Sequence, residues 1–169
     1  MAERTAPEAI EAYLAPRRRM VSVVTPVVLR QARRSQLPDD LVDVILGNGE
    51  PVRLRGRERI NLGVRMRVRL NQLGPPRGPW EAETAAYEYR MSDEDDREIL
   101  VYHWHPDGQS HVTTPHLHLG PGTEVGRAAL LTAHLPTGLV PIHAVLRLAI
   151  ESLGTEPARR DWDPVLHAT

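Results

Sequence analysis

The chain contains no cysteine, no lysine and no phenylalanine. Without cysteine it can form no disulfide bond, no thiolate metal site and no cysteine nucleophile. Without lysine, all 21 basic residues are arginine, so the number of arginines alone does not indicate a partner. Without phenylalanine, the core has to be built mainly from aliphatic side chains. Several classes of site are therefore excluded before any motif is considered.

Long apolar runs are also missing. A membrane-spanning helix needs about 20 consecutive apolar residues, and the chain has no such run. The apolar segment 20–29 follows three arginines, but it is short and lacks the small-residue cleavage site of a signal peptide. The absence of cysteine fits a reducing compartment. We therefore expect a cytoplasmic protein with no membrane partner.

Charge is divided unevenly along the 169 residues. Residues 1–70 carry 14 arginines and 8 acidic residues, whereas residues 71–169 carry 7 arginines and 14 acidic residues. The resulting net charges, +6 and −7, sum to the −1 of the whole chain. The basic half either binds an anion or is neutralised by the acidic half within one fold.

The hydrophobic pattern predicts an α+β fold with a mainly antiparallel sheet of about four strands, covered on one face by helices. The clearest strand is 60–71, in which aliphatic residues alternate with polar residues, three of them arginine. We expect a helix at 141–153, whose apolar residues recur on one side, to cover the aliphatic face of this strand. The other predicted strands are 80–91, 99–105 and 109–119, the last broken at Pro115, and the other predicted helices are 7–14, 38–46 and 127–134.

These elements predict one α+β domain over residues 1–169. Residues 1–59 form a helical or irregular N-terminal part, 60–119 an antiparallel meander, and 120–169 a linker, a helix and a tail. The helix at 38–46 is predicted from the proline and the two aspartates at its start and from the glycine that follows it.

Five of the eight histidines lie between residues 103 and 118. His103 and His105 form a first histidine pair, and His116 and His118 form a second, with His111 between them. Side chains two residues apart on a strand point to the same face, so each pair aims two imidazoles in one direction. Imidazole is the commonest metal ligand and also titrates near neutral pH. The remaining histidines are interpreted as isolated surface or helix-packing residues: His134, His143 and His167.

The turn after the first histidine pair decides which histidines meet. Pro106 and Gly108 fit the second and fourth positions of a type I turn. A tight hairpin there brings the first pair beside His111. A longer loop over about 106–114 instead brings the first pair beside the second. Because Pro115 is a poor residue within a strand, we favour the longer loop.

Such a cluster is a candidate site for a divalent transition metal, although a protein without a cofactor remains an alternative. Three or four neutral imidazoles within about 2.1 Å of one ion make a site of this kind, and a carboxylate can complete it. The candidate metal ligands are His103, His105, His111, His116, His118 and Glu124. In the simpler interpretation, the histidines only pair with carboxylates or with cross-strand neighbours.

The arginines of the 60–71 strand are candidate nucleic-acid contacts, because guanidinium groups hold phosphates. They are Arg65, Arg67 and Arg69. If they share a face with the histidines, the combination suffices for metal-independent RNA cleavage, in which two histidines act as base and acid on a ribose hydroxyl. The candidate catalytic residues are His103, His105, His116 and His118. The sequence has no phosphate-binding loop, dinucleotide motif or helical zinc-protease motif.

Four segments resemble the layout of TumE-type toxin–antitoxin proteins: Tyr87-Glu88-Tyr89-Arg90, an acidic turn at 93–96, Val101-Tyr102-His103, and Pro115-His116-Leu117-His118-Leu119. The resemblance covers about residues 85–120. It departs from the family where His103-Trp104 stands in place of Asp-Asn and where the Lys-Gly before the second histidine pair is missing. The resemblance implies a small bacterial protein that acts on RNA or inhibits growth.

These patterns give a leading hypothesis and two alternatives. The leading hypothesis is a small bacterial nucleic-acid-acting protein, in the form of a toxin-like ribonuclease with RNA as its partner. One alternative is a metal-binding protein that uses the histidine cluster. The other is a non-catalytic subunit that binds a protein partner, such as an antitoxin or another member of a complex. Whether the protein is an enzyme stays open at this point.

Overall fold

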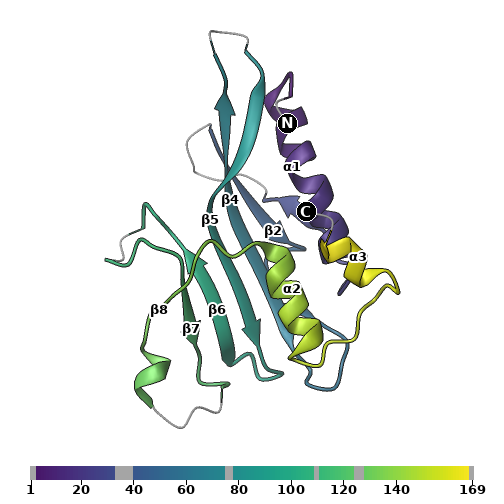
Figure 1. Ribbon diagram of the computed structural model, residues 1–169, viewed down its shortest axis with the longest axis vertical. Coiled ribbons are helices and arrows are strands. Elements are labelled where there is room, and N and C mark those ends of the chain that lie inside the picture. The colour runs from purple at the N-terminus through teal and green to yellow at the C-terminus, as the bar shows by residue number, and fades with distance from the viewer. Residues whose placement is uncertain (1–2, 33–39, 75–77, 109–110, 124–127, 168–169) are drawn as a thin grey trace.

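The protein is described here by a computed structural model, which covers residues 3–32, 40–74, 78–108, 111–123 and 128–167 (Figure 1). An eight-stranded antiparallel sheet carries the α-helices on one side (Figure 1). The predicted α+β class and antiparallel sheet are confirmed. The prediction of about four strands is wrong, because the sheet contains eight.

The strands follow the order β1-β2-β4-β5-β6-β7-β8, and β3 also pairs with β4. Their bounds are β1 Leu29–Gln31, β2 Leu41–Leu46, β3 Val52–Arg53, β4 Asn61–Gln72, β5 Trp80–Ser92, β6 Glu98–Trp104, β7 His116–Leu119 and β8 Leu135–Pro136. The three long strands, β4, β5 and β6, match the predicted ones. Of the predicted strand at 109–119, residues 109–110 lie outside the described residues, and the described part forms a strand only at the four residues of β7. Strands β1, β3 and β8 have only two or three residues, too few to show a period in the sequence.

The predicted helix at 38–46 is wrong. Within this segment, Leu41–Leu46 form β2, which pairs antiparallel with β4. The start of the segment, 38–39, lies outside the described residues. Val42, Val44 and Ile45 are β-branched and favour a strand. Pairing with β4 also satisfies backbone groups on both strands, so tertiary pairing outweighs the helix-start signals.

Three α-helices are described: α1 Ala6–Val21, α2 Ile142–Glu151 and α3 Trp162–His167. The helix α1 begins with a capping box between Thr5 and Glu8 and continues past Pro16, so it is twice as long as predicted. The predicted helix at 141–153 is confirmed as α2, whereas the one at 127–134 is a short 3-10 turn, η1 Ala128–Leu131. Among the described residues, no helix has the length and apolar character needed to cross a membrane.

The core lies between the helices and one face of the sheet. Alternate residues of β4 are buried there, as its period predicts: Leu62, Val64, Met66, Val68 and Leu70. The helix α1 packs on β4 and β5, and the hydroxyl of Tyr13 lies 2.6 Å from that of Thr84. The helix α2 packs against α1 and contributes Val145 and Leu146 to the same core. The helix packed on the aliphatic face of β4 is thus α1, and the predicted helix, α2, joins the same core through its packing on α1.

The other face of the sheet, called the open face below, carries the residues that alternate with the core. One row of cross-strand partners runs from β4 to β7: Arg65 lies opposite Glu88, Glu88 opposite His103, and His103 opposite His116. Residues two apart on one strand share a face. The face that carries His103 therefore also carries the second histidine pair and three arginines, called the arginine stripe below: Arg65, Arg67 and Arg69.

Candidate metal centre

The pairing of β6 with β7 brings the two histidine pairs together. His103 is the cross-strand partner of His116, and Val101 is the partner of His118. The chain between the strands forms a turn in which the amide of Gly108 donates to the carbonyl of His105. A tight hairpin would pair His103 with His111, but His103 pairs with His116 instead. The sheet thus adopts the longer-loop alternative.

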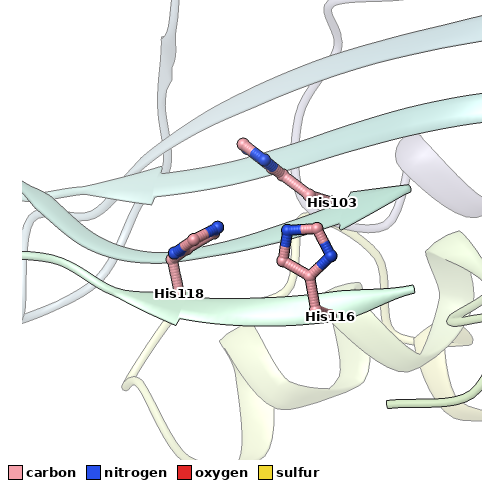
Figure 2. Close-up of side chains that lie close together, drawn as sticks. All are labelled: His103, His116 and His118. Carbon is pink, nitrogen blue, oxygen red and sulfur yellow. The ribbon is translucent and has the colours of Figure 1, made fainter. Parts of the chain in front are cut away.

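Three imidazoles converge from β6 and β7 (Figure 2). The ring centroid of His103 lies 5.7 Å from that of His116 and 5.2 Å from that of His118. The centroids of His116 and His118 are 4.8 Å apart. One ring nitrogen from each of the three residues lies within 4.8 Å of the other two. Figure 2 shows the three side chains projecting from the same side of the two strands. This set is called the histidine triad below.

His116 is held in a defined orientation. Its side chain is buried, with 3% of its surface exposed. Its Nδ1 lies 2.7 Å from the carbonyl oxygen of Thr114, a group that only accepts hydrogen bonds. Nδ1 therefore carries the proton and donates, which leaves Nε2 with a free lone pair. A backbone carbonyl that fixes the tautomer in this way is a common outer-shell feature of metal-binding histidines.

Burial lowers the pKa values of two members of the triad, His103 and His118. The pKa of His103 falls to about 4, first because burial disfavours the charged imidazolium and then because His105, His118 and other histidines surround it. The pKa of His118 is also lowered, again mainly by burial. His103 is therefore neutral near pH 7, which is the form that binds a metal. A neutral imidazole accepts protons but cannot serve as a general acid.

A second group shares His103 with the triad. Glu88, His103 and His105 also place one ligand atom each within 4.8 Å of one another. The carboxylate Oε2 of Glu88 lies 3.5 Å from Nε2 of His103. The ring of His105 lies 4.9 Å from that of His103. Both groups contain His103, so they belong to one centre: His103 is grouped with His116 and His118 in one set and with Glu88 and His105 in the other.

The remaining candidate ligands fall outside both groups. His111 is exposed, and its nearest described ring is that of His134, at 6.0 Å. Glu124 lies outside the described residues. His134, interpreted from the sequence as isolated, lies beside the triad instead, with its ring 4.4 Å from that of His118 and 5.1 Å from that of His116. Its position just before β8, the strand that pairs with β7, accounts for this, and no short-range spacing indicates it.

The arginine stripe lies on the same face, two strands away from the triad. It lines a cavity of about 660 Å³ that also reaches Glu88, His105 and Asp107. Arg67 pairs with Asp43 at 3.3 Å, and Arg69 approaches Asp40 at 3.9 Å and Asp107 at 3.8 Å. Arg65 is exposed and has no carboxylate within ion-pair distance among the described residues. Within the described part of the chain, two arginines of the stripe thus have carboxylate partners and Arg65 has none.

Comparison with known proteins identifies no relative of this chain. No family model matches the chain, and no curated protein or solved structure is significantly similar to it. The resemblance to TumE-type proteins consequently stays a prediction from the sequence, and the case for a function rests on the geometry of the open face.

Proposed function

We propose that the protein binds one divalent transition-metal ion through the histidine triad, His103, His116 and His118. The observation that carries this proposal is the convergence of three imidazole nitrogens within 4.8 Å of one another. Nitrogens bound to one tetrahedral ion at about 2.1 Å stand about 3.4 Å apart, so small rotations of the rings suffice to close the site. Three protein ligands leave the fourth position for water or a substrate.

The donor set restricts the metal. Three neutral imidazoles suit zinc, copper, nickel, cobalt or iron, whereas magnesium and calcium prefer oxygen ligands. Glu88 is placed either to complete the coordination shell or to orient His103, since its carboxylate lies 3.5 Å from that ring. His134 is the other candidate for the fourth position, because its ring lies 4.4 Å from that of His118.

A metal-independent ribonuclease, the leading hypothesis from the sequence, is the second candidate. It is favoured by the row that joins Arg65 to His103 on one face. It is weakened by the low pKa of His103, because this imidazole cannot supply a proton near pH 7. A metal centre needs no protonated histidine, so it is consistent with the low pKa of His103.

Zinc titration of the metal-free protein by calorimetry tests the proposal. We expect one zinc ion per chain, with the affinity reduced more than about 100-fold in His118→Ala, a larger effect than loss of an outer-shell partner. His143→Ala is the matched control, because this histidine lies on α2, away from the open face. Circular dichroism of both variants checks that the fold is intact. Absence of zinc binding, or equal binding by wild type and His118→Ala, would overturn the proposal.

A further inference from the structure

Arg65 is the one member of the arginine stripe that is ready to bind a ligand. Arg67 and Arg69 are both engaged by aspartates, whereas Arg65 has no described carboxylate partner. Its cross-strand partner, Glu88, does not form an ion pair with it and lies instead beside His103. An exposed guanidinium with its five donors free is suited to a carboxylate or phosphate oxygen.

Arg65 also stands at the right distance from the histidine triad to share a ligand with it. Only Glu88 separates it from His103 in the cross-strand row. Neighbouring strands lie about 4.8 Å apart, so the backbones of Arg65 and His103 are about 10 Å apart. The guanidinium of Arg65 lies near Gly49, in the turn after β2, and its exposed side chain has to turn across β4 to meet a metal ion on His103. A tetrahedral oxyanion bound to both would bridge the remaining gap.

The charges around the cavity show why such a ligand needs the metal. Three arginines line the cavity, and three acidic residues, Asp43, Glu88 and Asp107, line it as well. The lining is therefore formally neutral and attracts anions only weakly. A divalent ion on the triad would make this region positive by two charges beside the free guanidinium. Anion binding at Arg65 should thus depend on the metal.

The direction of the stripe points to the kind of anion. Arg65, Arg67 and Arg69 follow one another along β4 at intervals of two residues, about 6.7 Å. This interval is close to the distance between successive phosphates in an extended nucleic-acid strand. The two tyrosines of β5, Tyr87 and Tyr89, are buried, so neither presents an exposed ring on which a base could stack. Recognition would therefore be of the backbone.

We infer that the metal centre and Arg65 bind one phosphodiester of a single-stranded nucleic acid whose backbone follows the arginine stripe along β4. This inference rests on the proposed metal centre and names its substrate class. Phosphodiesters from RNA and from DNA share the chemistry that the site recognises.

Fluorescence anisotropy with a short labelled single-stranded RNA, and with DNA of the same sequence, tests the inference. We expect binding to the zinc-loaded protein that weakens at least about tenfold when zinc is chelated or when Arg65 is changed to glutamine, the loss of a charge-assisted hydrogen bond. Arg57→Gln is the matched control, because Arg57 is exposed and approaches only the adjacent Glu58. Binding should also weaken as salt rises. A preference for either strand type would identify the source of the phosphodiester.

Zinc titration of the same samples separates the two proposals. If zinc binds to the triad but neither nucleic acid binds, or if binding is unaffected by Arg65→Gln, the nucleic-acid inference fails and the metal centre stands. If nucleic acid binds equally with and without zinc, the shared site is wrong. If zinc itself does not bind, the proposed function fails, whatever the nucleic acids do.

Discussion

The two halves of the open face, the arginine stripe on β4 and the histidines on and beside β6 and β7, differ in how exposed their polar side chains are and in what these side chains contact. On the arginine half, Arg67 and Arg69 are partly exposed and lie beside aspartates. On the histidine half, His116 is buried, and only 24% of the His103 side chain is exposed. Five imidazoles, counting His105 and His134, adjoin one another there with Glu88 as the carboxylate close to His103.

This difference separates arginines that lie beside aspartates from imidazoles that lie mainly beside one another. Exposed ion pairs are solvated and contribute little to stability. The clustered imidazoles are different, because each neutral ring carries on one nitrogen a lone pair that can bind a metal. A metal ion would use several of these lone pairs at once. The comparison therefore predicts that the histidine half responds strongly to metal and pH, and that the arginine half responds mainly to salt.

The largest expected effect is stabilisation by zinc. At a free zinc concentration one hundred times the Kd, binding to the folded state alone adds about 2.7 kcal/mol to the free energy of unfolding. For a chain of this size the Tm should rise by about 5–10 °C. Thermal unfolding of wild type and His118→Ala, with and without zinc, measures the effect. An equal rise in both proteins would remove the triad as its source.

How far the sequence predicts this centre depends on the range of the signals. The period of two in 60–71 predicted β4 and the exposure of Arg65, because alternation is a local property of one strand. The two His-X-His pairs predicted that imidazoles share a face. By contrast, the approach of His134 depends on the pairing of β7 with β8, which joins segments with no common local pattern.

The fold shows the same limit. The segment 41–46 has local helix signals before it, yet it forms β2 because β4 offers a partner strand distant in sequence. Strands β1, β3 and β8 are too short for a period to be visible. Whether the loop after His105 was tight or long also depended on which strand paired with β6. Local periods were therefore predictable, and the pairing between segments was not.

A smaller effect is expected from pH in the metal-free protein. His103 takes up a proton near pH 6.5 in the unfolded chain but only near pH 4 when folded. The unfolded state therefore binds more protons between these values, and stability present above pH 6.5 is lost as the pH falls towards 4. We expect a loss of about 1–2 kcal/mol, because part of the side chain remains in solvent.

Denaturant unfolding of wild type and His103→Gln near pH 7 and near pH 5 measures this contribution. The variant should lose less stability on acidification than the wild type, because it lacks the imidazole whose pKa is lowered. A variant with the same or a steeper loss would show that His103 is not the source.

The smallest effect is expected on the arginine half. The coupling between Arg67 and Asp43, measured by a double-mutant cycle with Arg67→Gln and Asp43→Asn, should be below about 1 kcal/mol because both side chains remain partly in solvent. High salt should reduce it further. A coupling as large as the zinc effect would mean that the two halves do not differ as described.

The most direct measurement of the central claim is anomalous scattering from crystals grown with zinc. The account predicts one strong peak on the open face, about 2.1 Å from one ring nitrogen each of His103, His116 and His118. A peak found only at His143 or His167, or no ordered zinc in crystals of protein saturated with the metal, would contradict it.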